Sequence, residues 1–200
     1  MPAAACLRAA LERSPEAKHW TVVETPDAQN TDADAALVEC IAALAPDALS
    51  ATCYLWNIER TLHLLRLLRR RLPALKIVIG GPDIAAEHPL LPEVGCQRSE
   101  LGNPTSDLRP PPSTLRFPAD ARVVGEGETV FPNVLRFFRT GRAPNFRGVL
   151  WRTPDGFIEG TRQRPVKPLQ NLLPAPDHPI NTPDAFGMAY LETNRGCPLR

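Results

Sequence analysis

The sequence predicts an α/β protein built around an open parallel sheet. Two short runs rich in apolar and β-branched residues, Ala48–Thr52 and Lys76–Ile79, are separated by a stretch with helical periodicity. A third such run, Ala121–Val124, is followed by another amphipathic stretch. Strands that alternate with helices form right-handed βαβ units, and such units build a parallel sheet covered on both faces.

The remaining elements follow from end signals such as proline, glycine and capping residues. We expect further strands at Trp20–Glu24 and Met188–Leu191, and a β-hairpin of Val149–Arg152 and Phe157–Glu159 around Thr153–Gly156. Pro132 is expected in the first turn of its helix, where proline is tolerated. The predicted helices are Ala3–Arg13, a segment capped by Thr31 or Asp32 and ended by Pro46, a segment from Asn57 to about Leu72, and a segment after Glu128 that Gly141 stops.

Composition excludes several classes of function. The net charge is +1, which gives no field that would attract nucleic acid or an anionic membrane, and no apolar run is long enough to span a bilayer. Arg66 and Arg69–Arg71 are expected to form a solvated helix face. The five cysteines are scattered without short spacings, which is typical of a reducing, cytoplasmic environment.

Three distinctive loops follow three of the predicted strands. They are Cys53–Asn57, Gly80–Asp83 and Gly125–Glu128. In open α/β sheets, ligands bind beyond the carboxyl ends of the strands, so these loops predict a binding site there. Each loop also has a simpler interpretation, because paired glycines are often turns, Tyr54 and Trp56 could be core aromatics, and acidic residues are favoured at a helix N-terminus.

The last residues contain a possible cluster ligand. Cys197 lies in Thr193-Asn-Arg-Gly-Cys-Pro198, directly after a predicted strand. Thiolates are the ligands that iron–sulfur clusters prefer, although a single cysteine is more often an ordinary thiol.

Five segments, in order, resemble the cobalamin-binding class of radical S-adenosylmethionine (radical SAM) enzymes. They are Ser50–Asn57, Ile77–Pro82, Val123–Glu128, Leu173–Asp177 and Asn194–Cys197. The resemblance implies a Rossmann-like (flavodoxin-like) cobalamin-binding domain over 1–142, a hairpin and Pro-rich linker over 143–185, and the first strand of a truncated radical SAM barrel over 186–200. Many members of this class transfer methyl groups.

The resemblance also implies cofactors and ligand residues. Cys197 would be the first ligand of a 4Fe-4S cluster that binds S-adenosylmethionine, with further cysteines due at positions 201 and 204, so this chain alone is expected to be inactive without the rest of the barrel. The Gly80-Gly81 loop would lie along the nucleotide tail of cobalamin, and Tyr54 and Trp56 would face the corrin ring. The implied cofactor-binding residues are Ser50, Thr52, Cys53, Tyr54, Trp56, Asn57, Gly80, Gly81, Pro82, Gly125, Glu126, Gly127 and Glu128.

Two features depart from the family pattern. No Asp-x-His-x-x-Gly segment offers a histidine as lower axial ligand to cobalt. The family's first strand should also precede the helix at Ala3, where this chain begins. Two other interpretations stay open: a Rossmann-like module that binds another small ligand without radical chemistry, and a domain that keeps the fold only for protein contacts. The absence of Gly-x-Gly-x-x-Gly argues against a dinucleotide.

Overall fold

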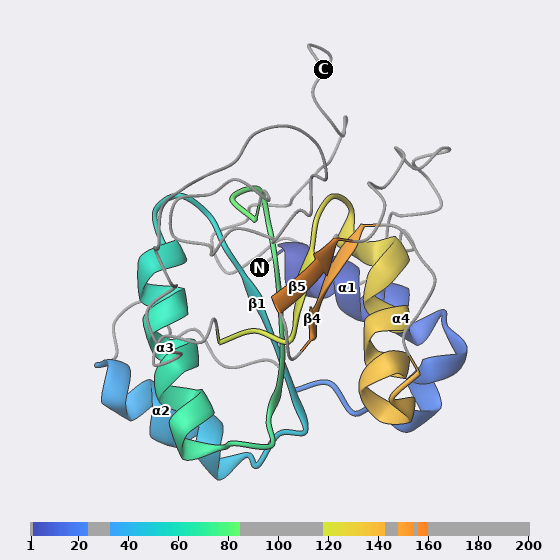
Figure 1. The fold of residues 1–200 in the computed structure, drawn as a ribbon. Helices are drawn as coiled ribbons and strands as arrows, with labels where there is room; N and C mark the ends of the chain where they lie inside the picture. The colour runs from blue at the N-terminus through green and yellow to red at the C-terminus, as the bar shows by residue number, and fades with distance from the viewer. Residues whose placement is uncertain (1, 24–32, 85–117, 143–147, 154–155, 160–200) are drawn as a thin grey trace, which may run out of the picture.

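The computed structural model describes residues 2–23, 33–84, 118–142, 148–153 and 156–159. Within them, helices flank a five-stranded sheet (Figure 1). The strands are β1 (Ala48–Thr52), β2 (Lys76–Gly80), β3 (Ala121–Val123), β4 (Val149–Thr153) and β5 (Gly156–Glu159). The helices are α1 (Pro2–Glu12), the 3-10 helix η1 (Pro15–His19), α2 (Asp34–Ala43), α3 (Ile58–Arg71) and α4 (Gly127–Thr140).

The sheet is mixed, with strands in the order β1-β2-β3-β4-β5. Strands β1, β2 and β3 run parallel, as the sequence predicts, and Val78 lies between Ser50 and Ala121. The predicted hairpin continues the sheet, because β4 pairs antiparallel with β3 and β5 with β4. The predicted α/β class and parallel strands are therefore confirmed, whereas the strand expected at Met188–Leu191 lies outside the described residues.

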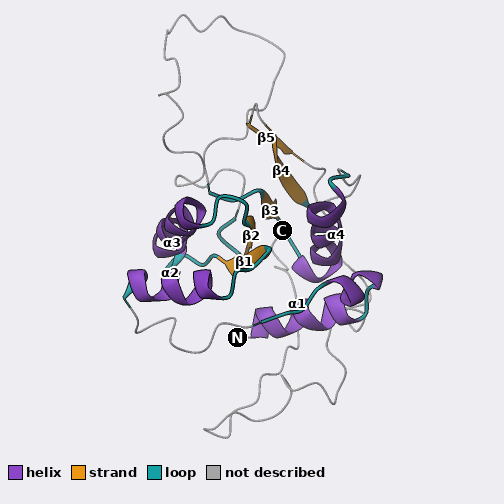
Figure 2. Cartoon of the chain, turned by 90° about the horizontal axis from the view of Figure 1, so that it is seen from below, coloured by secondary structure: helices purple, strands orange, loops and turns teal. Residues whose placement is uncertain are grey.

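Helices cover the two faces of the sheet unequally. Figure 2 shows α2 and α3 on one side of the parallel strands and α1 and α4 on the other. Helix α2 packs against α3, while α1 packs against α4 and η1. Helix α1 is thus held mainly by another helix, which leaves part of the β1 face uncovered.

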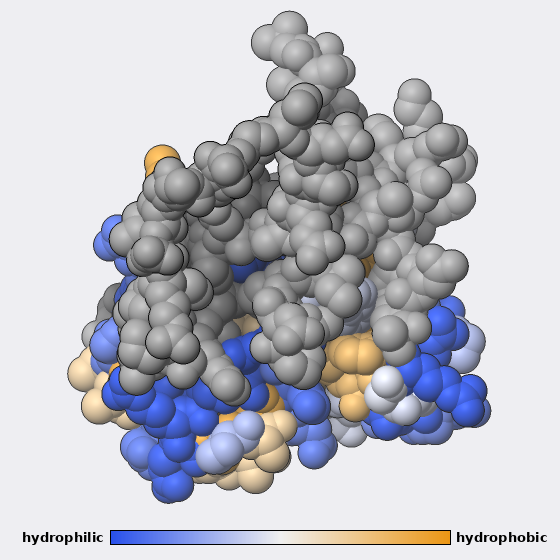
Figure 3. Space-filling model, viewed as in Figure 1, coloured by the Kyte–Doolittle hydropathy of each residue, from blue (hydrophilic) through white to orange (hydrophobic). Residues whose placement is uncertain are grey.

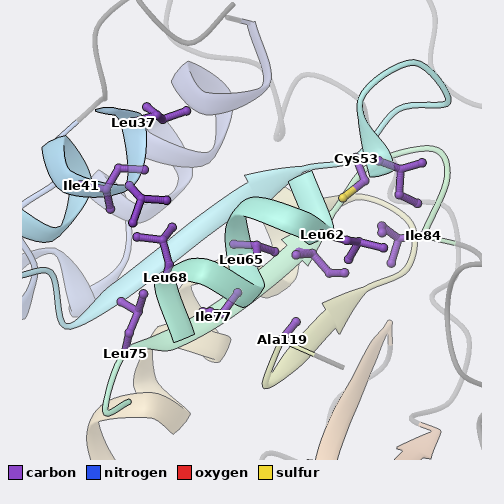
Figure 4. Packing of buried hydrophobic residues seen from close by; sticks show 13 residues of the cluster. Leu37, Ile41, Cys53, Leu62, Leu65, Leu68, Leu75, Ile77, Ile84 and Ala119 are labelled. Carbon is purple, nitrogen blue, oxygen red and sulfur yellow. The ribbon is translucent and has the colours of Figure 1, made fainter. Parts of the chain in front are cut away.

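The face toward α2 and α3 carries the larger apolar core. Leu62, Leu65 and Leu68 of α3 pack in one cluster with Ile77 and Ile79 of β2 (Figure 4). The side chains of a strand alternate between faces, so Val78 points the opposite way. Because β2 is buried on both faces, its uniformly apolar sequence is explained.

The second core lies between the sheet and α4. Val78 and Val123 pack there with Val134 of α4 and with Trp151 of β4. The ring centroids of Phe137 and Trp151 are 4.3 Å apart at an interplanar angle of 61°, an edge-on contact. The hairpin is therefore fixed to the domain by its own aromatic side chain.

Two local predictions are wrong. Residues 20–23 form no strand, and Val22 and Val23 are exposed. β-branched residues favour a strand only where a neighbouring strand pairs with them and covers them, and this segment has no place in the described sheet. Pro132 is the sixth residue of α4 and so lies beyond its first turn. Proline has no backbone N–H, so the carbonyl oxygen four residues earlier loses its helical hydrogen bond. The packing of α4 must compensate for this loss.

Arg69 is a structural residue and does not belong to a solvated face. Its guanidinium donates to the carbonyl oxygens of Leu75 at 2.5 Å and Pro118 at 2.9 Å, and to Oδ2 of Asp120 at 2.5 Å. The same Asp120 oxygen accepts from the backbone N–H of Ile77 at 2.8 Å. Arg69 therefore ties the end of α3 to the beginnings of β2 and β3.

Glu16 joins the N-terminal segment to α4. Its carboxylate accepts hydrogen bonds from Nε and Nη2 of Arg139 at 3.0 and 2.9 Å. These hydrogen bonds lower the pKa of Glu16 below its usual value, although burial acts in the opposite direction. Among the described residues, no helix is both long and apolar enough to cross a membrane.

Replacing Arg69 by methionine is expected to destabilise the domain by roughly 2–4 kcal/mol, because it leaves the Asp120 carboxylate and two carbonyls without their donor. Urea unfolding would measure this loss. Arg70→Met is the matched control, since Arg70 is exposed on the same turn of α3. Equal losses in both variants would contradict the structural role of Arg69.

The Glu16–Arg139 pair predicts a pH-dependent part of stability. Because the pKa of Glu16 is lowered in the folded state, its contribution is present above the unfolded pKa of about 4.3 and is lost as the pH falls through the folded value. Glu16→Gln should therefore have a lower Tm than the parent near pH 7, and the gap should close toward pH 3. A gap that stays constant across this range would contradict the assignment.

Candidate functional site

A cavity of about 550 Å³ lies at the carboxyl edge of the parallel strands. Its floor is formed by Ser50 of β1 and by the largely buried side chains of Val78 of β2 and Val123 of β3. Ser50 is exposed there, although it lies within a strand. The volume falls within the range of small-molecule pockets, and the position is where open α/β sheets bind ligands.

The walls of the cavity come from segments far apart in the sequence. The loops after β1, β2 and β3 contribute Tyr54, Gly81 and Gly125, while α1 contributes Ala3 and Leu7. Helix α1 approaches the start of α4 closely. A Cβ added at Gly127 would lie only 2.9 Å from Cδ2 of Leu7. The absence of a side chain at Gly127 lets α1 close this wall.

Gly81 is required by the protein backbone itself. Its φ is +115°, and a Cβ there would lie 2.3 Å from the carbonyl oxygen of Cys53. Gly80 differs, because a Cβ there would meet only Val123 atoms at 3.6 and 3.8 Å, which is ordinary contact. The glycine pair thus combines one position that requires glycine with one where a Cβ would be tolerated.

Cys53 points away from the cavity, although the sequence places it among the ligand residues. It is fully buried in the core beneath α3 (Figure 4). Burial, together with the nearby Asp83, raises the pKa of the Cys53 thiol to about 12. The raised pKa disfavours a thiolate nucleophile at this position at neutral pH.

Tyr54 and Trp56 form an aromatic stack at the rim. Their ring centroids are 4.6 Å apart at an interplanar angle of 8°. Tyr54 lines the cavity, whereas Trp56 and Leu55 project into solvent with 79% and 75% of their surfaces exposed. On the side shown in Figure 3, much of the described surface is hydrophilic, with apolar patches between. Two large exposed apolar side chains beside a cavity are typical of a surface that something covers.

Asn57 shapes this loop from within. Its Oδ1 accepts the backbone N–H of Tyr54 at 2.8 Å, and its Nδ2 donates to the carbonyl oxygen of Thr52 at 3.2 Å. Asn57 occupies the N-cap position of α3 without capping the helix through its side chain. The residue therefore fixes the turn that presents Tyr54 and does not itself line the cavity.

The acidic end of the cavity is the start of α4. Glu126 holds the N-cap position with an extended backbone, and Glu128 lies in the first turn. Gly125 precedes them with φ of +101°, which favours glycine. Both glutamates line the cavity, and Oε2 of Glu126 is enclosed by protein.

The structure brings ten of the thirteen residues predicted from the loops to one cavity. Cys53, Trp56 and Asn57 lie outside its lining. Sequence reasoning missed the wall from α1 and the floor residues Val78 and Val123, because nothing local distinguishes these apolar positions from ordinary core. The lining residues that were predicted are Ser50, Thr52, Tyr54, Gly80, Gly81, Pro82, Gly125, Glu126, Gly127 and Glu128.

Metal ligands are not gathered in this part of the chain. No group of three or more His, Cys, Asp or Glu side chains that could hold a metal ion occurs among the described residues. Cys197, the predicted cluster ligand, lies outside those residues. The described lining of the cavity consists of apolar side chains, glycine backbone and a few polar side chains.

Comparison with known proteins points to one class of enzyme. Over 169 residues the chain is 31% identical to 2-(S-pantetheinyl)-carbapenam-3-carboxylate methyltransferase of Streptantibioticus cattleyicolor, covering 76% of this chain and 21% of that protein. It is 27% identical over 165 residues to the cobalamin-dependent radical SAM methyltransferase TokK of Streptomyces tokunonensis, again covering 76% of this chain and 21% of that protein. This similarity supports the resemblance drawn from the motifs.

The match has a limited extent. The chain spans about a fifth of the length of these curated relatives, 21% in each case. No protein-family profile matches the chain. The similarity therefore covers only part of such an enzyme and leaves the activity of a whole protein to be proposed.

Gly81→Ala is expected to destabilise the domain by at least about 2 kcal/mol, because it combines a disfavoured φ with a clash against the Cys53 backbone. Gly80→Ala is the matched control and should change stability by less than about 1 kcal/mol. Chemical unfolding of both variants would measure the difference. Similar losses at the two positions would show that the Cys53 contact is not the constraint.

Proposed function

We propose that this chain forms the cobalamin-binding part of a radical SAM methyltransferase. The observation that carries the proposal is the cavity at the carboxyl edge of β1–β3, lined by the three loops that resemble the family's cobalamin-binding segments. The similarity to a cobalamin-dependent radical SAM methyltransferase supports the same assignment. A nucleotide, flavin or other small ligand would be the alternative occupant of a Rossmann-like module.

The residues present fit the cofactor in size and chemistry. A cavity of about 550 Å³ would hold one end of cobalamin, and the floor of Val78 and Val123 offers apolar contact. Gly80 and Gly81 line the cavity without side chains, so the nucleotide tail could lie against the backbone at this strand end. Tyr54, whose ring is stacked on Trp56, would face the corrin ring.

When bound, cobalamin supplies a cobalt centre able to carry a methyl group. The part of this chain would be to hold the cofactor and exclude water from its inner end. The 4Fe-4S cluster that binds S-adenosylmethionine would require further cysteine ligands besides Cys197. The substrate would be chosen by the barrel.

We further propose that cobalamin binds without a protein histidine on cobalt. Of the four histidines, His19 and His63 lie in the described residues, and neither lines the cavity. His63 is on α3, with Nε2 3.9 Å from Oδ2 of Asp34. The electron paramagnetic spectrum of the cob(II)alamin form should therefore lack the nitrogen splitting of an axial imidazole.

Cobalamin binding is tested most directly by filling the cavity. The 200-residue chain, mixed with hydroxocobalamin and separated by gel filtration, should retain the visible bands of the cofactor. Ser50→Trp should reduce affinity by at least about tenfold, since Ser50 is exposed on the cavity floor and an indole would occupy that space.

Ala48→Trp is the matched control, because Ala48 lies on the same strand face two residues earlier and does not line the cavity. Retention of cobalamin by the Ser50→Trp variant would move the site elsewhere. Failure of the parent chain to bind cobalamin, with binding of a nucleotide or flavin instead, would favour the alternative module.

A further inference from the structure

Strand β1 ends the sheet on one side, and its outer edge has no strand beside it among the described residues. None of its five residues is buried, whereas β2 and β3 are buried over most of their length. A strand with a neighbour on one side only leaves a row of backbone N–H and C=O groups unpaired on the other. The outer edge of β1 is therefore a surface that can pair with a further strand.

The hydrogen bonds between β1 and β2 identify the backbone groups that point outward. In a parallel ladder the N–H and C=O of one residue turn to the same neighbouring strand, and successive residues alternate. The carbonyl oxygen of Asp47 accepts from the N–H of Lys76 at 3.0 Å, and the N–H of Cys53 donates to β2 at 2.7 Å. Asp47, Cys53 and the alternate residues between them thus turn toward β2. The groups that project from the free edge belong to Ala48, Ser50 and Thr52.

Strand β1 lacks the features by which proteins commonly protect an edge. Its sequence, Ala48-Leu-Ser-Ala-Thr52, contains no charged residue and no proline, and its register with β2 is unbroken. At its carboxyl end, Nδ2 of Asn57 already donates to the carbonyl oxygen of Thr52 at 3.2 Å. The open part of the edge is therefore centred on Ser50.

Helix α2, which flanks β1, adds little charge to this surface. Its buried residues belong to the same core cluster against which Leu49 of β1 packs. Its two carboxylates are paired within the chain, Asp34 with Nε of Arg60 at 2.8 Å and Glu39 with Nε of Arg71 at 3.4 Å. A strongly charged partner would find little to complement here, so a neutral strand fits best. Apart from Glu39, the exposed residues of α2 are small and uncharged, namely Ala35, Ala36, Cys40 and Ala43.

We propose that two copies of this chain associate by antiparallel pairing of their β1 edges. A two-fold axis perpendicular to the sheet brings the same edge of two copies together antiparallel, which makes the contact self-complementary. With the axis at Ser50, the two Ser50 residues exchange both backbone hydrogen bonds, and Ala48 of each copy pairs with Thr52 of the other. The edge of a second copy thus supplies the neutral strand that this surface fits, and the side chains brought together are small and uncharged.

Sedimentation equilibrium of the 200-residue chain tests the association. The mean mass is expected to rise from one chain toward two as the concentration increases from about 1 to about 200 µM, the range over which a micromolar dimer forms. A mass of one chain throughout this range would overturn the proposal.

Substitutions at Ser50 test where the contact lies. Ser50→Lys places two positive charges directly opposite each other, and Ser50→Glu places two negative charges there, so each variant alone should dimerise at least about tenfold more weakly. In an equimolar mixture, lysine lies opposite glutamate and dimerisation should recover. Damage to the fold could not be repaired by such mixing.

Arg136→Gln is the matched control for these variants. It changes the net charge by the same amount as Ser50→Glu, and Arg136 is exposed on α4, which packs against β2 and β3. This variant should dimerise like the parent chain. Dimers that survive both Ser50 substitutions, or folded variants that do not recover on mixing, would overturn the pairing at Ser50.

Ala48→Pro tests the backbone contribution independently. It removes the outward N–H at the first position of β1, a position where proline is tolerated in a strand, and it should weaken dimerisation by at least about threefold. If the Ser50 variants do not fold by circular dichroism, this variant decides, and an unchanged dimer would then be contrary to the proposal.

Discussion

The contact between the Gly81 and Cys53 backbones is the constraint on which the rest of the site depends. Strands β1 and β2 end side by side. The backbone at Gly81 then passes so close to the backbone of Cys53 that position 81 has no room for a Cβ. The crossing is reinforced by the N–H of Cys53, which donates to the carbonyl oxygen of Gly80 at 2.7 Å. Because Cys53 is drawn into the core beneath α3, the residues after it turn outward and bring Tyr54 to the cavity.

The other side of the cavity depends on how α1 is held. The pairing of Glu16 with Arg139 and the close approach of Leu7 to Gly127 fix the N-terminal segment to α4. Helix α1 is therefore kept to one side of the sheet, and Ser50 remains uncovered in the middle of β1. A helix placed over β1 would fill the same space with side chains, so the position of α1 creates the cavity.

These two arrangements give the site its proposed chemistry. The sheet supplies an apolar floor, the glycines supply backbone without side chains, and the start of α4 supplies two carboxylates. Such a surface offers apolar contact, close approach to the backbone and a few polar groups to an organic ligand. The proposed corrinoid binding is consistent with this lining and with the similarity to a cobalamin-dependent radical SAM methyltransferase.

The sequence by itself determined the alternation of strands and helices and the loops at the carboxyl edge. Its apolar periods and end signals are local, and they correctly placed β1, β2, β3 and the hairpin. It could not determine the partners of each segment. The β-branched run at 20–23 forms no strand, because a strand needs a neighbouring strand to pair with it and side chains to cover it. Arg69 stabilises the beginnings of two strands because Asp120 lies beside it in space. Only the tertiary structure decided that Cys53 faces the core and that α1 closes the cavity, since each depends on contacts between residues far apart in the chain.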